Sequence, residues 1–176
     1  MTVRVIVPLV YKRNLNYLPN AMKRYWLLKS EPSGFSIDDL KAEPNRTAHW
    51  DGVRNYQARN FMKEQRKGDR AFFYHSGHPA PAIAGVMEIT REAYPDPTQF
   101  DPRSEHYDPG SRKDNPRWVQ VNVRYLSSFI RPLSLKEIKM IPALKRMLLL
   151  AHSRLSVMPV SAAGWRWILR RGQDKT

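Results

Sequence analysis

The sequence contains no cysteine and no long apolar run. Without thiols the chain cannot build a disulfide scaffold, a cysteine-ligated zinc site, an iron–sulfur cluster or a thiol nucleophile. A membrane-spanning helix needs about 20 consecutive apolar residues, so we expect no integral membrane protein. The chain of 176 residues has the length of one domain, and its 41% hydrophobic and 26% charged residues are typical of a globular protein.

Acidic residues are scarce at both ends of the chain. Residues 1–30 hold no aspartate or glutamate, and residues 131–176 hold only Glu137 and Asp174. The middle segment, 31–130, has fourteen residues of each sign, so the two ends carry the whole formal net charge of +14. If the ends meet in the fold they form an electropositive face, which attracts phosphate backbones. A solvated basic surface or a targeting segment is the alternative interpretation.

Residues 1–23 are interpreted as a basic N-terminal extension. Their apolar stretch is short and broken by Pro8, unlike a secretory signal, and they lack the serine-rich amphipathic helix of a mitochondrial presequence. We therefore expect an intracellular protein, cytoplasmic or nuclear, with a mitochondrial location as the alternative raised by the acid-free basic start. The domain itself is predicted over residues 24–170, followed by a C-terminal tail at 171–176.

Aromatic and aliphatic segments predict strands at 24–29, 71–76, 82–94, 117–130 and 154–160. Ser36, Asn55, Ser134 and Ser161 are placed to cap helices, and the helix after Asn55 is expected to run to about 67. Gly85 indicates a bulge or bend within its strand. Strands with helices inserted between them favour an α+β domain around a small curled sheet or barrel.

Residues 95–116 differ in character from the rest, because they carry five prolines and four aspartates and show no periodicity. A segment of this length without periodicity is usually a binding loop, a lid or a disordered insert. We expect this segment, with Tyr107, to act as the rim or lid of a site.

The motifs of enzymes and metal sites are weak in this chain. There is no G-x-S-x-G elbow and no phosphate- or dinucleotide-binding glycine pattern, and the five histidines lack ligand spacing. We therefore expect no catalytic residue, no metal and no cofactor. General acid–base chemistry by Glu31 or Asp51 with His75 remains the basis of an alternative, an enzyme or sensor acting on a nucleotide or small polar ligand.

Aromatic and small polar residues gather at the predicted strand ends. The set comprises Ser30, Trp50, Asn55, Tyr56, His75, Ser76 and Ser156, with Lys29 and Arg154 beside them. Such a mixture suits a planar ligand with a polar edge, because rings stack on its face while Ser, Asn and His bind its edge. Trp26, Phe72, Phe73 and Trp165 are instead expected in the core, where large aromatic residues usually pack.

Several stretches resemble the EVE domain family. They are YWLLKSEP (25–32), WDGVRNYQARN (50–60), GDRAFFYHS (68–76), YPDPTQFD (94–101), PRWVQVNV (116–123) and RLSVMPV (154–160). The resemblance covers residues 24 to about 168 in order. It implies a PUA-like pseudo-barrel of mixed and antiparallel strands with surrounding helices, related to YTH and ASCH domains. It also implies binding of nucleic acid that carries a modified base, with the base flipped into a pocket.

When the family's pocket is carried onto the matching motifs, its residues come from four of the six stretches: 25–32, 50–60, 68–76 and 154–160. Its residues would be Ser30, Trp50, Val53, Asn55, His75, Ser76, Leu155, Ser156 and Met158. The family often has glutamine where this chain has Met158, so an amide that could bind a base edge is absent here.

Together these observations predict a non-catalytic protein that binds DNA or RNA containing a modified base, with no membrane partner and a monomeric state. The predicted base-binding residues are Ser30, Trp50, Val53, Asn55, Tyr56, His75, Ser76, Leu155, Ser156 and Met158. The predicted phosphate-binding residues are Lys23, Arg24, Lys29, Arg154, Arg166, Arg170 and Arg171.

Overall fold

The structure is a computed structural model that describes residues 24–77 and 80–173. The expected N-terminal extension, 1–23, and Lys23 with it, lie outside the described residues. No described helix has the length and apolar character needed to cross a membrane.

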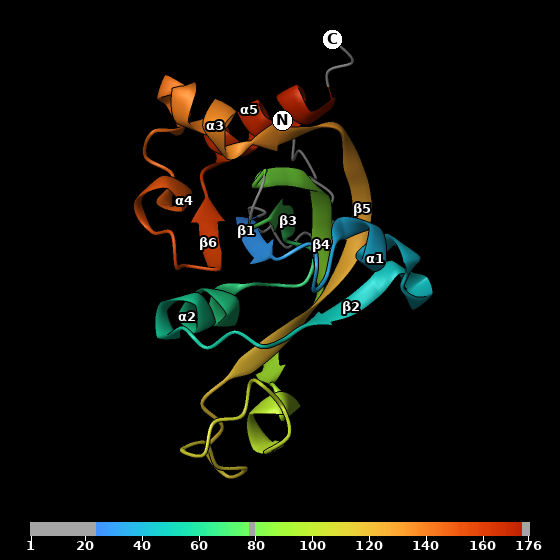
Figure 1. The fold of residues 1–176 in the computed structure, drawn as a ribbon, viewed down its shortest axis with the longest axis vertical. Helices are drawn as coiled ribbons and strands as arrows, with labels where there is room; N and C mark the ends of the chain where they lie inside the picture. Colours follow the sequence, from blue (N-terminus) through green and yellow to red (C-terminus); the bar gives the residue numbers. More distant parts are fainter. Residues whose placement is uncertain (1–23, 78–79, 174–176) are drawn as a thin grey trace, which may run out of the picture.

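One mixed sheet of six strands organises the chain, in the order β2-β5-β4-β3-β1-β6. The strands are β1 (Tyr25–Ser30), β2 (Thr47–Trp50), β3 (Arg70–His75), β4 (Ala82–Pro95), β5 (Val119–Ser134) and β6 (Val157–Val160). β1 and β3 run parallel, whereas the other neighbouring pairs are antiparallel. The long strands β4 and β5 curve around the core (Figure 1), and the predicted α+β pseudo-barrel of mixed strands is confirmed.

Helices cover the sheet and its ends: α1 (Ile37–Ala42), α2 (Tyr56–Glu64), α3 (Leu135–Met140), α4 (Leu148–Ala151) and α5 (Ala162–Gln173). Short 3-10 helices, η1 (Pro44–Arg46), η2 (Pro97–Phe100) and η3 (Pro142–Leu144), lie in the connections. Figure 1 shows α3 and α5 at one end of the molecule, and the loop between β4 and β5 at the other.

The predicted helix caps are present. Ser36 and Ser134 form capping boxes with Asp39 and Glu137, and the Asn55 side chain accepts a hydrogen bond from the Ala58 amide. These contacts satisfy amides that would otherwise have no partner in the first helical turn. The Ser161 hydroxyl likewise accepts from the amide of Gly164 at 3.1 Å.

Some boundaries differ from expectation. The helix after Asn55 ends at Glu64 rather than near 67, because Gln65 takes an extended conformation. The sequence between 134 and 151 forms three short helices, α5 runs past the expected tail boundary at 171, and β2 was not expected. The register shift of the β3–β4 and β4–β5 pairs beside Gly85 confirms the predicted bulge.

The core lies between the sheet and its helices. The aromatic residues expected there, Trp26, Phe72, Phe73 and Trp165, are all buried. Trp165 of α5 stacks on Phe72 with ring centroids 4.0 Å apart and on Tyr25 at 4.6 Å. This packing joins α5 to β1 and β3, and the C-terminal end of β1 reaches the site described next.

Candidate functional site

A cavity of about 790 Å³ opens where β1 and β2 end, beside the loop that leads into β6. Its walls are formed by Lys29, Ser30, Glu31, Gly34, Phe35, Trp50, Asp51, Gly52, Val53, Arg54, Asn55, Glu105, His106, Arg154 and Ser156. A smaller cavity of about 250 Å³ shares five of these residues and adds His49. Residues far apart in the sequence therefore meet around one hollow, which is large enough for a nucleobase.

Many of the predicted site residues meet at this cavity. From the predicted base-binding set, the structure brings together Ser30, Trp50, Val53, Asn55 and Ser156. Lys29 and Arg154, from the predicted phosphate-binding set, lie beside them.

Trp50 supplies an aromatic part of the wall. It is the last residue of β2, where it pairs with Val121 of β5, and only 6% of its surface is exposed. Its ring meets Phe73 edge-on at a centroid distance of 5.2 Å and Phe35 at 6.4 Å. These contacts hold the indole in a fixed orientation beside the cavity.

The hydrogen bonds of Ser30 and Asn55 determine what each can offer a ligand. The Ser30 hydroxyl donates to the Phe35 carbonyl oxygen at 2.8 Å, so its lone pairs remain as acceptors. The Asn55 side-chain oxygen accepts from the Ala58 amide at 2.9 Å, so its amide nitrogen remains as a donor. The cavity wall thus carries one defined acceptor and one defined donor.

The turn after β2 is tied to the 95–116 segment. The Asp96 carboxylate accepts hydrogen bonds from the Gly52 amide at 3.1 Å and from Arg54 Nη1 at 2.8 Å. Its other oxygen accepts from the backbone amide and hydroxyl of Thr98. Burial raises the pKa of Asp96, but the hydrogen bonds from Thr98, Arg54 and Gly52 outweigh it and hold the pKa below the usual range.

Gly52 permits the close approach of His106 to this turn. Its φ is +70°, and a Cβ there would lie 2.5 Å from the His106 ring nitrogen Nε2. The 95–116 segment thus supplies Glu105 and His106 to the cavity wall. Tyr107, expected on the rim, is 42% exposed and does not line the cavity.

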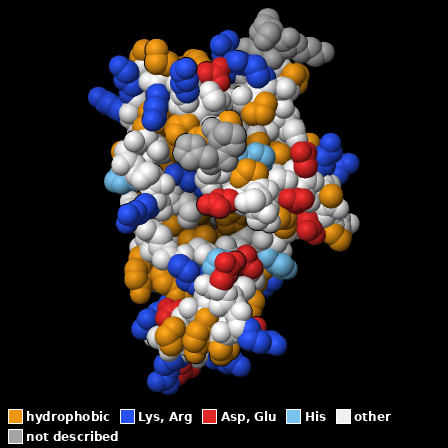
Figure 2. Space-filling view, in the orientation of Figure 1, with side chains coloured by type: hydrophobic (Ala, Val, Ile, Leu, Met, Phe, Trp, Pro, Cys, Tyr) orange, Lys and Arg blue, Asp and Glu red, His pale blue; other side chains and the backbone are white. Residues whose placement is uncertain are grey.

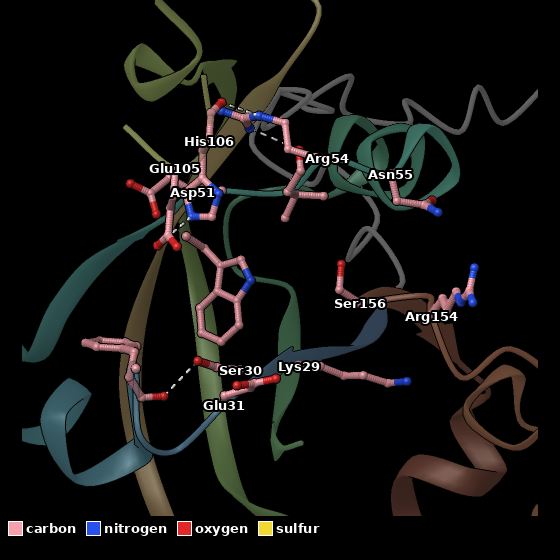
Figure 3. A pocket seen from close by; sticks show the side chains of 15 residues that line it. Lys29, Ser30, Glu31, Asp51, Arg54, Asn55, Glu105, His106, Arg154 and Ser156 are labelled. Atoms are coloured by element: carbon pink, nitrogen blue, oxygen red, sulfur yellow. Dashed lines mark hydrogen bonds and ion pairs between the residues drawn. The ribbon is translucent and has the colours of Figure 1, made fainter. Parts of the chain in front are cut away.

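Charged side chains from several elements line the cavity. Figure 3 shows Asp51, Glu105 and His106 gathered on one side, and Arg154 and Ser156 on another. Burial, together with the negative charge of Asp96, raises the pKa of Asp51. Burial lowers the pKa of Lys29, whose ammonium donates to the Ser153 carbonyl oxygen at 3.1 Å.

Other predicted base-binding residues do not line the cavity. His75 Nε2 accepts a hydrogen bond from the Ile37 amide at 3.1 Å, and burial lowers the pKa of its imidazole. The Ser76 amide donates to the Ser30 carbonyl oxygen. Leu155 and Met158 are buried. Leu155 lines a separate cavity of about 270 Å³ that shares Asn55 and Arg154 with the large one, and Met158 pairs with Leu27 in the β1–β6 ladder. The predicted contact of these four residues with a base stays a prediction.

Tyr56 also lies outside the cavity, at the start of α2. It is 54% exposed, and its ring lies against Trp118 with a centroid distance of 4.8 Å. The Arg59 guanidinium lies 4.8 Å from the centre of the Tyr56 ring. Because Tyr56 follows the cavity residue Asn55, this cluster adjoins the cavity.

The remaining predicted phosphate-binding residues are dispersed. Arg24 lies at the opposite end of β1 from Lys29 and forms an ion pair with Glu64 at 3.7 Å. Arg166, Arg170 and Arg171 lie on α5. Figure 2 shows Lys and Arg side chains spread over this face of the molecule, both at the end where Figure 1 shows α3 and α5 and at the end of the loop between β4 and β5.

Sequence reasoning did not identify Arg54, Glu105 and His106 as site residues. Arg54 stands inside the quoted WDGVRN motif, so its position was a usable signal. Glu105 and His106 lie in the aperiodic segment, where nothing in the sequence indicates which side chains turn toward the cavity.

Comparison with known proteins places the chain in a family. The EVE domain matches residues 24–171. Human thymocyte nuclear protein 1 is 44% identical over 171 residues, which cover 88% of this chain and 76% of that protein. The zebrafish (Danio rerio) protein of the same name is 47% identical over 161 residues, covering 82% and 70%.

Solved structures agree with this assignment. Human THYN1 protein in complex with 5-methylcytosine containing DNA superimposes with a TM-score of 0.83 at 43% identity, covering 88% of this chain and all of that one. A hypothetical protein from Leishmania major gives 0.82 at 45% identity, covering 85% and 94%. A YTH domain from Zygosaccharomyces rouxii, at 17% identity and a TM-score of 0.51, shares the fold. This chain belongs to the EVE domain family.

Proposed function

We propose that this protein binds nucleic acid carrying a modified base and takes that base, extruded from its stack, into the cavity. One observation carries the proposal: an aromatic side chain (Trp50), polar side chains (Ser30 and Asn55) and cationic side chains (Lys29 and Arg154) line the same cavity, which is large enough for a nucleobase. The relative solved with 5-methylcytosine containing DNA, at 43% identity over 88% of this chain, supports the same reading and makes a methylated cytosine the first candidate.

The wall matches the chemistry of a base. The face of a base stacks on an aromatic ring, which contributes about 1–3 kcal/mol of binding free energy, and Trp50 is the ring held in place here. The edge of a base carries donors and acceptors in one plane, and the Ser30 oxygen and the Asn55 nitrogen are free to bind them. Extruding a base costs a few kcal/mol, an amount that these contacts together can offset.

Phosphates would be held at the rim by Lys29 and Arg154. Both residues line the cavity, and Arg154 forms no ion pair among residues 24–77 and 80–173. Arg24 and the arginines of α5 would add a longer-range attraction for the phosphate backbone. Tyr56, with Arg59 against its ring, would stack on a base next to the extruded one, since it is exposed beside the cavity.

Fluorescence anisotropy tests this function with matched DNA and RNA oligonucleotides, plain or carrying one methylated base, titrated at two salt concentrations. The proposal predicts tighter binding of one modified oligonucleotide and a steep fall of affinity with salt, since phosphate contacts release counterions. Trp50→Phe, which keeps a ring, should reduce the preference for the modified base, and Phe100→Leu, away from the cavity wall, should leave it unchanged. Salt-independent binding of a free nucleoside without binding of oligonucleotides would instead favour the small-ligand alternative.

A further inference from the structure

Asp51 is a cavity carboxylate whose hydrogen bond within the protein comes from its own backbone amide. It follows Trp50, which is paired in the sheet, and it precedes Gly52, whose amide is bound to Asp96 at 3.1 Å. It lines both the large cavity and the smaller one that shares its wall. In the part of the chain that the structure describes, no side chain donates a hydrogen bond to its carboxylate or forms an ion pair with it.

The other cavity carboxylates differ from Asp51 in this respect. Glu105 lies 3.6 Å from the His106 ring nitrogen, and Glu31 lines only the large cavity. Asp51 alone of the three is common to both cavities and adjoins the aromatic wall. A base lying against Trp50 would therefore present one of its edge groups to the carboxylate of Asp51.

An ionised carboxylate only accepts hydrogen bonds. In the free protein Asp51 is exposed to water, and a base that fills the cavity displaces the water on the side of the carboxylate that faces it. Unless the base supplies an N–H group, the carboxylate loses its hydration without replacement, which is unfavourable. Cytosine presents an exocyclic amino group at C4, where thymine and uracil present a carbonyl oxygen that would repel the carboxylate. Thymine and uracil also carry a ring N3–H, but it lies one ring position away, so a thymine held in the same place would still turn its C4 oxygen toward Asp51.

Arg154 lies on another side of the cavity from Asp51, which gives a nucleotide a direction of entry. Lys29 and Arg154 attract the phosphate, and Figure 3 shows Arg154 and Asp51 on different sides of the hollow. A nucleotide whose phosphate lies near Arg154 thus extends its base across the cavity toward Asp51.

We propose that Asp51 selects a base carrying an exocyclic amino group over one carrying a carbonyl oxygen at that position. This inference rests on the proposed function, because it concerns how the same cavity chooses among bases. It identifies the ligand by chemical class: a nucleotide with an amino-bearing base.

The test uses duplexes that differ in one probe base, 5-methylcytosine or thymine, which share the ring and the methyl group. An abasic site opposite the probe removes the difference in base-pair strength. We expect the wild-type protein to favour 5-methylcytosine by about tenfold or more, since a site that hydrogen-bonds a substrate group rejects analogues lacking it. A third probe, 5-methyl-2-pyrimidinone, lacks the amino group and should bind as weakly as thymine.

Asp51→Asn should reduce the ratio of the two affinities to near one, because the amide can donate to a carbonyl oxygen as well as accept. Asp51→Ser should also bring the ratio near one, which shows that the effect comes from losing the carboxylate and not from the new amide group. Glu43→Gln removes one negative charge at an exposed position outside the cavity and should leave the ratio unchanged.

A wild-type ratio near one, or an unchanged ratio in both Asp51 variants, overturns the inference while leaving modified-base binding in place. If the wild-type protein binds none of the duplexes, both the proposed function and this inference are wrong. The two failures are thus distinguishable.

Discussion

Arg54 Nη1 donates to the Asp96 carboxylate at 2.8 Å, and this ion pair joins the turn after β2 to the segment that follows β4. The same guanidinium donates to the His106 carbonyl oxygen at 2.7 Å and to the Thr98 hydroxyl at 2.9 Å. Arg54 therefore holds the 95–116 segment against the cavity from the motif that also supplies Trp50 and Asn55.

Removing Arg54 should destabilise the protein. The Asp96 side chain is fully buried, so Arg54→Ala leaves a buried charge without its cation, which typically costs about 3 kcal/mol. Urea denaturation would measure the change in the free energy of unfolding. Arg103→Ala breaks an ion pair in which the arginine is 90% exposed and should change stability little. Equal effects of the two variants would contradict this account of the pair.

Gly52→Ala should lower the thermal stability of the protein more than an alanine replacement at a glycine that has no close neighbour. The new Cβ would meet the His106 ring at 2.5 Å, in addition to the strain of a φ of +70°. Gly68 has a φ of +92° but no neighbour within 4 Å of an added Cβ, so Gly68→Ala isolates the backbone strain, about 1 kcal/mol. We expect the larger loss of thermal stability for Gly52→Ala; equal losses would mean that His106 does not pack there.

His75 should make folding stability depend on pH. In the folded state burial lowers the pKa of its imidazole from the ordinary value of 6.5, and its neutral Nε2 accepts the Ile37 amide. As the pH falls through 6.5, the unfolded chain binds a proton that the folded chain does not, so stability decreases. Chemical denaturation at pH 7.5 and pH 5.5 would show this loss.

His75→Gln, which keeps an acceptor but does not titrate, should reduce the difference between the two pH values. His152→Gln alters an exposed histidine and should leave the wild-type difference intact. If His75→Gln instead keeps the pH dependence and abolishes the preference for a modified base, His75 acts on the ligand rather than on α1.

The two groups of basic residues should affect binding differently. Arg154→Ala removes a cation at the cavity and should weaken binding of plain and modified oligonucleotides alike, with the slope of log affinity against log salt reduced by about one. Arg166→Ala, on α5, should have a smaller effect. Equal effects would place the phosphate path along α5 instead.

Much of the fold could be predicted because its signals are local. Ser36 and Ser134 carry their capping partners three residues on, and alternating or continuous apolar residues marked five strands. β2 carried no such signal, since its sequence TAHW (Thr47–Trp50) is neither long nor continuously apolar, and its pairing with β5 is a long-range contact. The helix ends after Glu64 at Gln65, which is extended and fully buried, a position that the local sequence does not indicate.

Site residues could be predicted only where a sequence motif coincides with the end of a strand or the start of a helix. Ser30, Trp50 and Asn55 meet at the cavity because β1, β2 and the start of α2 converge there. His75 ends a strand too, but its side chain turns to α1, a choice that no sequence pattern records. Glu105 and His106 reach the cavity through the hydrogen bonds of Arg54 and Asp96, which are visible only in three dimensions.

The central claim is that a modified base enters the cavity, and nuclear magnetic resonance of the base tests it directly. A duplex with one 5-methylcytosine, ¹³C-labelled at its methyl group, would be titrated with the protein. A methyl group that lies among Trp50 and the neighbouring rings should shift upfield and show nuclear Overhauser contacts to the indole protons, and Trp50→Phe should remove those contacts. A methyl resonance that stays at its free-duplex position while the DNA is saturated with protein would contradict the account.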